Sequence, residues 1–171
     1  VPVSSSASAP AAAPVGAAIP AGVNLLTNGS ATDGGTTGWT IIAAGGNGWS
    51  TGGGTGYDGV GGYFITSYGL CQRSQTIDLL AAGATEAELD AAPPIRVSEA
   101  ISSYLNNLPD TYYIRVELRD ASGTPVATWD AGTAAARKTA PSSWIVESHE
   151  FRDYGPGVRT IYFEDGGIDV G

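Results

Sequence analysis

The sequence contains one cysteine, Cys71, and no methionine among its 171 residues. A single cysteine cannot form an intrachain disulfide, which excludes a small secreted scaffold held together by disulfides. One cysteine and one histidine also cannot supply the ligands of a zinc site, so we expect neither a metal nor a cofactor. We expect Cys71 to be a small core residue, with attachment of a thioether-linked chromophore as the alternative.

Basic residues are few, and long apolar runs are absent. Lysine and arginine number 8 against 17 aspartate and glutamate residues, which gives a formal net charge of −9. The basic residues are scattered, whereas binding to nucleic acid needs a cluster of them that displaces counterions. No apolar run approaches the roughly 18–20 residues that a membrane span requires. These absences exclude nucleic-acid-binding and membrane-spanning proteins.

The first 22 residues carry no charge and consist mainly of alanine, serine and proline. Their prolines block helix formation, so the composition predicts a flexible arm over residues 1–22, with an extended arm that lies on a partner as the alternative. A start that is rich in serine and poor in acidic residues also resembles what remains of a processed plastid transit peptide. We therefore expect a plastid or cytoplasmic location rather than secretion.

Residues 23–171 contain short apolar runs separated by glycine- and proline-rich turns, as expected for one β domain. The clearest pattern is at 112–119, where apolar and polar residues alternate. Thr85 and Glu88 have the spacing of a capping box, which predicts one helical turn over 85–90. Together these features predict an all-β fold, an antiparallel β-sandwich. Strands are expected over residues 23–26, 39–43, 63–66, 75–79, 95–101, 112–119, 126–130, 144–151 and 158–164.

Several motifs together resemble a known family, the F-box-associated domain. They include GGNGW at 45–49, FITSYGLC at 64–71, QTIDL at 75–79 and SHEFRDYGPGVR at 148–159. The resemblance covers residues 23–169 and implies a jelly-roll-like sandwich of about ten strands. It also implies a recognition function, because this domain binds the core of high-mannose N-glycans in some F-box proteins. Tyr68 occupies the position of an aromatic residue that contacts the sugar in those members.

The sequence also departs from the family pattern. After the Gly166–Asp169 turn, it shows neither the family's Tyr-Trp-Lys run, which contacts sugar, nor the final strand beyond it, and no F-box precedes the domain. A missing strand leaves unpaired backbone groups on its neighbour, which can pair with another chain. We therefore expect an open C-terminal edge and, through it and the N-terminal arm, contacts with other protein subunits.

The candidate binding residues are tyrosines in or beside the glycine-rich stretch 48–62. Tyr57, Tyr63 and Tyr68 are the candidates for a glycan- or partner-binding surface. All four tryptophans are of the type that stacks on sugars, but we expect Trp39 and Trp49 to pack in the core.

The residues that could support catalysis or metal binding have simpler structural explanations. His149 lies in an alternating strand, and we expect it to be structural, with Ser148 on the opposite face. We expect the acidic residues near the C-terminus to be solvated turn carboxylates, because they lack the spacing of a calcium loop. These residues are Asp153, Glu164, Asp165 and Asp169.

Two hypotheses for the function follow, and an enzyme is not expected. The preferred one is a non-catalytic structural or interaction module, a linker or scaffold subunit in a larger assembly such as an algal plastid light-harvesting complex. The alternative is lectin-like recognition of high-mannose N-glycans on glycoproteins. The family resemblance and Tyr68 favour the lectin, whereas the missing Tyr-Trp-Lys run favours the scaffold.

Overall fold

The computed structural model describes residues 22–59, 61–104 and 107–171. Apart from Gly22, the predicted arm over residues 1–22 lies outside the described residues. In chain order the elements are β1 (Thr40–Ala44), β2 (Ser50–Gly52), the 3-10 segment η1 (Tyr57–Gly59), β3 (Tyr63–Ile65), β4 (Cys71–Asp78), α1 (Glu86–Asp90), β5 (Ile95–Ile101), β6 (Thr111–Asp120), β7 (Pro125–Ala131), β8 (Lys138–Thr139), β9 (Ile145–Phe151) and β10 (Val158–Ile168).

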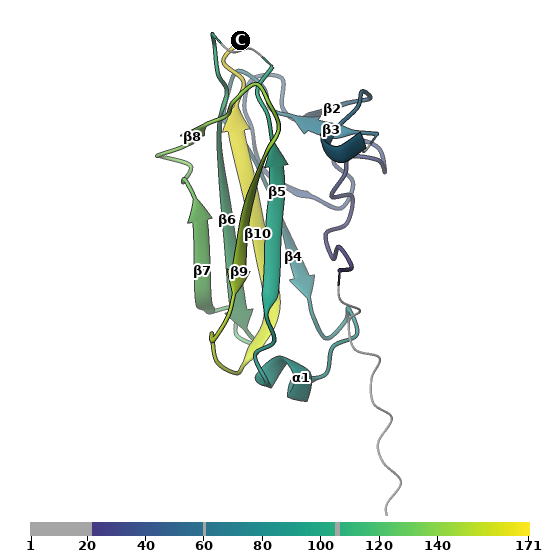
Figure 1. Cartoon of the computed structure of the whole chain (residues 1–171), viewed down its shortest axis with the longest axis vertical. Helices are drawn as coiled ribbons and strands as arrows, with labels where there is room; N and C mark the ends of the chain where they lie inside the picture. Colours follow the sequence, from purple (N-terminus) through teal and green to yellow (C-terminus); the bar gives the residue numbers. More distant parts are fainter. Residues whose placement is uncertain (1–21, 60, 105–106) are drawn as a thin grey trace, which may run out of the picture.

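The strands form two layers, and every pairing is antiparallel (Figure 1). The larger sheet has the order β1-β4-β10-β6-β7, with β8 paired to β6. The second layer consists of β5 and β9, which lie in front of the larger sheet in Figure 1, and β2 pairs with β3 at one side. At the end of the molecule, Thr85 and Glu88 form the predicted capping box of α1. The predicted antiparallel β-sandwich with one helical turn is therefore confirmed.

The hydrophobic core lies between the two layers and is centred on β6. Ile114, Val116 and Leu118 alternate along this strand and are 0% exposed. β10 pairs with β6 so that Ile161 faces Leu118 and Phe163 faces Val116. Side chains of β5 and β9 close the core from the other layer. The alternation predicted over 112–119 is thereby confirmed.

Three segments differ from the prediction. Residues 23–26 form no strand, because the Asn24 side-chain oxygen accepts a hydrogen bond from the Leu26 backbone N–H at 3.1 Å and satisfies that group locally. Leu26 nevertheless packs against the core. β2 and β8 were not predicted, since a glycine-rich strand of three residues and a strand of two residues carry no apolar alternation.

The last strand is central in its sheet, not at an edge. β10 pairs with β4 on one side and with β6 on the other. The expectation of an open edge beside the C-terminal strand is therefore wrong for β10. Within the described residues, β5 pairs with β9 alone, so an unpaired edge lies in the second layer instead.

A buried ion pair joins β4 to β10 inside the sandwich. Arg73 and Asp165 are cross-strand neighbours, and Arg73 donates from Nε and Nη2 to the two carboxylate oxygens of Asp165 at 2.8 and 2.6 Å. Asp165 is 2% exposed, so its assignment to a solvated turn was wrong. Glu164 was misplaced in the same way. The physical reason is that β10 continues to Ile168, which makes the acidic run part of a strand.

Three aromatic rings surround the Arg73 guanidinium. Its central carbon lies 3.8 Å from the ring centroid of Trp39, 3.7 Å from that of Phe64 and 4.5 Å from that of Trp49. Contacts of this kind stabilise a cation, particularly when water is excluded. Both tryptophans are half-buried. Trp39 packs against the hydrophobic core, as expected, whereas Trp49 is half-buried beside the buried cation and Phe64.

Glu99 brings a third ionisable side chain to this buried cluster from β5. Burial, followed by the nearby charge of Asp165, raises the pKa of Glu99 well above its ordinary value of 4.5. Its Oε2 atom is buried and has no hydrogen-bond partner among the described residues. This environment therefore favours the protonated, neutral form of Glu99.

Removal of Arg73 should destabilise the fold strongly. We expect Arg73→Met to lower the free energy of unfolding by about 3–5 kcal/mol, because Asp165 is left buried without its counter-charge. Arg96→Met is the matched control: Arg96 is 77% exposed in its pair with Glu150, so its loss should cost less than about 1 kcal/mol. Urea unfolding measures both values. Similar small losses in the two variants would show that the buried pair is not critical.

The raised pKa of Glu99 predicts a distinctive pH dependence. The folded chain holds the proton more tightly than the unfolded chain, so this contribution to stability is complete below pH 4.5 and is lost as pH rises through the folded pKa. Glu99→Gln stays neutral. The free energy of unfolding of this variant, measured by urea unfolding, should therefore increase relative to that of the wild type from pH 5 to pH 8. The increase should be about 1.4 kcal/mol for each pH unit between 4.5 and the folded pKa of Glu99.

Glu150→Gln is the control with the opposite sign. The hydrogen bond from Arg96 lowers the pKa of Glu150, so the wild type should gain stability relative to this variant as pH rises toward 4.5, and the difference between the two should change little from pH 5 to pH 8. A Glu99→Gln variant whose stability parallels the wild type across this range would contradict a neutral Glu99.

Candidate functional site

Tyr68 is presented to solvent by the connection between β3 and β4. Its side chain is 71% exposed. Behind it, the Gly45 backbone N–H donates to the Leu70 carbonyl at 3.0 Å, and the Asn47 backbone N–H donates to the Ser67 hydroxyl at 3.0 Å. Two loops are thus bound to each other, and the ring of Tyr68 projects from their surface.

Glycines allow this close contact between the two loops. A Cβ atom on Gly69 would lie 2.6 Å from the Gly46 nitrogen, and one on Gly46 would lie 2.6 Å from the Ser67 hydroxyl. Gly46 also has a φ of +62°, a conformation that side chains rarely adopt. The GGNGW motif therefore forms the backbone support on which Tyr68 rests.

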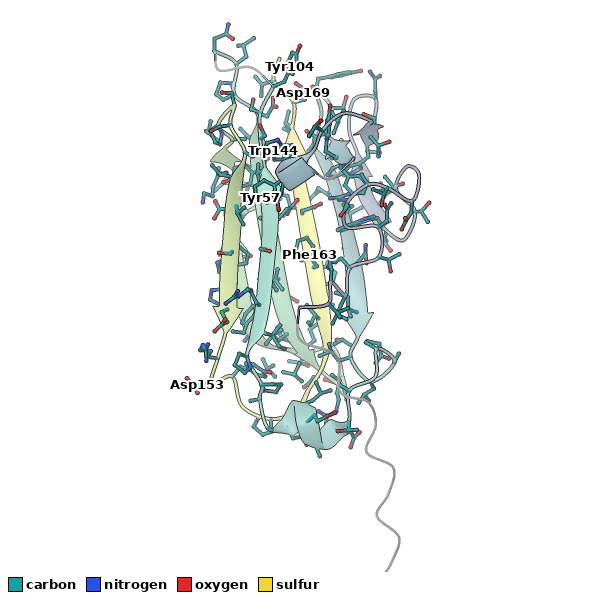
Figure 2. All side chains as sticks on the ribbon, turned by 45° about the vertical axis from the view of Figure 1, so that its right-hand side comes forward. Tyr57, Tyr104, Trp144, Asp153, Phe163 and Asp169 are labelled. Atoms are coloured by element: carbon teal, nitrogen blue, oxygen red, sulfur yellow. The ribbon has the colours of Figure 1, made fainter. Side chains whose placement is uncertain are left out.

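The C-terminal end of β10 supports the same loop. The Asp169 backbone N–H donates to the Ser67 carbonyl at 2.9 Å. Figure 2 shows Asp169 and Tyr104 at the end of the sandwich opposite Asp153 and α1. Tyr104, which is 92% exposed, was not among the predicted site residues. Tyr104 and the end of β10, which supports the Tyr68 loop, therefore lie at the same end of the molecule.

Tyr57 and Tyr63 meet at Trp144, and we call these three residues the aromatic cluster. The ring centroids of both tyrosines lie 6.3 Å from that of Trp144, with interplanar angles of 64° for Tyr57 and 71° for Tyr63. These are edge-on contacts of the kind that aromatic pairs prefer. Tyr57 is 43% exposed and Trp144 is 38% exposed, and Figure 2 shows these two side chains close together on one side of the sandwich.

The structure therefore divides the predicted site residues between two places. Tyr57 and Tyr63 belong to the aromatic cluster, whereas no ring contact among the described residues joins Tyr68 to them. Sequence reasoning considered Trp144 only as a tryptophan that could stack on sugar. Its contact with Tyr57 spans a long stretch of chain and depends on how η1 and the start of β9 pack, which no local pattern reveals.

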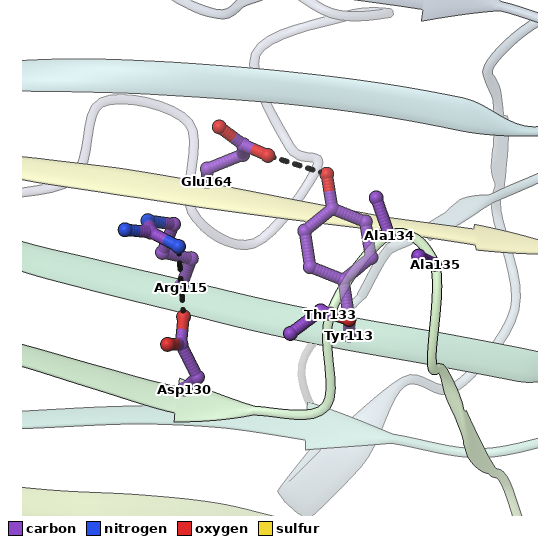
Figure 3. A pocket seen from close by; sticks show the side chains of 7 residues that line it. All are labelled: Tyr113, Arg115, Asp130, Thr133, Ala134, Ala135 and Glu164. Carbon is purple, nitrogen blue, oxygen red and sulfur yellow. Dashed lines mark hydrogen bonds and ion pairs between the residues drawn. The ribbon is translucent and has the colours of Figure 1, made fainter.

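A cavity of about 280 Å³, lined by apolar surface as well as charged side chains, lies on the outer face of the larger sheet (Figure 3). Its polar groups are already paired: the Tyr113 hydroxyl donates to Glu164 at 2.6 Å, and Arg115 lies 3.6 Å from Asp130. Burial, followed by the hydrogen bond to Glu164, raises the pKa of Tyr113 above its ordinary value. This internal pairing makes the cavity a stabilising network of the sheet.

His149 has a packing role in the structure. Its ring stacks on Trp129 with centroids 5.5 Å apart and an interplanar angle of 8°, and it meets Phe151 edge-on at 4.6 Å. Ser148 is exposed, as expected for the neighbouring position of a strand. The two residues therefore do not form a nucleophile–base pair.

Cys71 and the acidic residues show no features of a reactive or metal-binding centre. The Cys71 side chain is 0% exposed, and its Sγ donates to the Gly45 carbonyl at 3.5 Å, which confirms a core residue. No group of three or more histidine, cysteine, aspartate or glutamate side chains in the described ranges could hold a metal ion. No helix in the same ranges is long and apolar enough to cross a membrane.

Comparison with known proteins assigns the chain to a family. The model of the F-box associated region matches residues 17–171. The chain therefore belongs to the F-box-associated family, as its motifs indicated.

Its relatives include two F-box only proteins. F-box only protein 6 of Bos taurus is 35% identical over 154 residues, which cover 86% of this chain and 58% of that protein. F-box only protein 44 of Homo sapiens is 35% identical over 112 residues, which cover 63% of this chain and 42% of that protein. The chain thus spans less than two thirds of the length of these relatives.

Among solved structures, the fold is similar to the enzymatically active domain of bacteriophage CBA120 tailspike protein 4. The TM-score is 0.60 with 13% sequence identity, and the match covers 86% of this chain and 19% of that one. At this identity the similarity shows the fold alone.

The burial of Cys71 predicts that its thiol is protected in the folded chain. We expect a soluble thiol reagent such as Ellman's reagent to modify the native protein at least about 100-fold more slowly than the urea-unfolded protein, because the reaction requires opening of the fold. The absorbance of the released thiolate measures both rates. Rapid modification of the native chain would show that the thiol is accessible and would contradict its burial.

Proposed function

We propose that this domain is a non-catalytic recognition module that binds high-mannose N-glycans on glycoproteins. Membership of the F-box-associated family supports this proposal, because the resemblance implies glycan recognition in some members. The comparisons favour this hypothesis over the linker or scaffold role that the sequence led us to prefer, and they give that role no support.

The observation that carries the proposal is the exposed ring of Tyr68 on a rigidly supported loop. An aromatic ring offers an apolar face to the C–H groups of a sugar, and its hydroxyl can hydrogen-bond at the rim. The backbone contacts of Gly45 and Gly46 hold the loop in place before a ligand arrives. Pre-organisation of this kind reduces the entropy lost on binding.

The charge of the chain agrees with an uncharged ligand. A formal net charge of −9 repels anionic partners, including sialylated or sulfated glycans, at long range. Neutral mannose and N-acetylglucosamine units are not subject to this repulsion. The charge therefore supports oligomannose glycans over acidic ones.

Replacement of Tyr68 should test this assignment. We expect Tyr68→Ala to weaken binding of chitobiose by about tenfold or more in isothermal titration calorimetry, because the stacking surface is lost. Leu80→Ala is the matched control. Leu80 is 39% exposed and follows the far end of the eight-residue strand β4, about 26 Å from the Tyr68 loop, so its replacement should leave binding unchanged. A wild-type chain that binds no chitobiose, or a Tyr68→Ala variant that binds as tightly, would refute the proposal.

A further inference from the structure

The aromatic cluster has an unused capacity for hydrogen bonding. Tyr57 and Trp144 are both exposed, and the hydroxyls of Tyr57 and Tyr63 make no hydrogen bond within the part of the chain that the structure describes. Exposed tyrosine and tryptophan side chains can contact a ligand with both an apolar ring face and a polar group. The cluster therefore combines an exposed apolar surface with two free hydroxyl groups.

The cluster is positioned by the backbone beneath it. Tyr63 faces Gly52 across the β2–β3 pair, and a Cβ atom on Gly52 would overlap the Tyr63 ring. The ring therefore fills the space that a side chain at this position would take. The rings of Tyr57 and Tyr63 both make T-shaped contacts with the indole of Trp144, which fixes the orientation of the indole ring.

The size of the surface favours a small ligand over a protein partner. An aromatic side chain has about 150–250 Å² of surface, so the exposed fractions of Tyr57 and Trp144 amount to on the order of 200 Å². A standard protein interface needs about 800 Å² on each partner. An aromatic surface of this extent instead matches the face of a single pyranose ring.

We propose that the aromatic cluster is a second carbohydrate subsite, which stacks an uncharged hexose ring on Trp144. The hydroxyls of Tyr57 and Tyr63 bind the hydroxyl groups at the edge of that ring. The subsite rests on the proposed function, since it receives a mannose unit of a glycan whose chitobiose core is bound at Tyr68. Asp58 beside Tyr57 and the overall negative charge disfavour an acidic sugar at this position.

The test compares two ligands by isothermal titration calorimetry: chitobiose and trimannosyl chitobiose. The wild type should bind the larger ligand more tightly. Trp144→Ala should bind trimannosyl chitobiose about fivefold or more weakly while its affinity for chitobiose is unchanged, and Trp144→Phe should retain most of the affinity. Tyr57→Ala, which removes an exposed ring outside the core, should show the same selective loss and decides the matter if Trp144→Ala fails to fold.

Val126→Ala is the control, because Val126 on β7 is 41% exposed, close to the value for Tyr57. It should bind both ligands as the wild type does. A wild type that binds both ligands with equal affinity would overturn the subsite, as would Trp144 and Tyr57 variants that lose nothing or lose affinity for both ligands equally. In these cases the role of Tyr68 stands. A wild type that binds neither ligand overturns the proposed function and the subsite together.

Discussion

The ion pair between Arg73 and Asp165 is the constraint on which the rest of the sandwich depends. Two charges inside a protein are tolerated only when they are paired and hydrogen-bonded, so β4 and β10 must keep the register that brings them together. The guanidinium in turn attracts the rings of Trp39, Trp49 and Phe64. Three aromatic side chains from separate segments of the chain therefore pack against one buried cation.

The same two strands hold the loop of the proposed glycan site. β4 begins at Cys71, directly after the Tyr68 loop, and β10 ends beside Asp169, whose N–H binds the Ser67 carbonyl. The ion pair fixes these strands next to each other, and the paired glycines fix the loop to its neighbour. A rigid core thus extends to the surface through short connections, which is how an exposed side chain can be held still without being buried.

Local patterns predicted most of the elements, but they could not predict the long-range contacts. The alternation over 112–119 and the Thr85 capping box each depend on neighbours in sequence, so both were predicted correctly. The partner of Asp165 lies 92 residues away, so its carboxylate was mistaken for a turn residue. The aromatic cluster was missed for the same reason. The motifs identified the family, yet they placed Tyr57, Tyr63 and Tyr68 in one group, whereas folding separates them into two.

This separation has a consequence for affinity under the proposed function. A single exposed ring such as Tyr68 supplies only a small stacking energy, which gives weak binding by itself. A second contact at Trp144 to the same oligosaccharide would be intramolecular once the first is made, so its effect on affinity depends on the spacing of the two sugars. Two weak contacts at fixed positions on the sandwich then discriminate between glycans of different length and branching. Only a glycan that reaches both Tyr68 and Trp144 gains the binding free energy of the second contact. Rigidity, set by the buried pair, is therefore the property that would convert two modest aromatic surfaces into specificity.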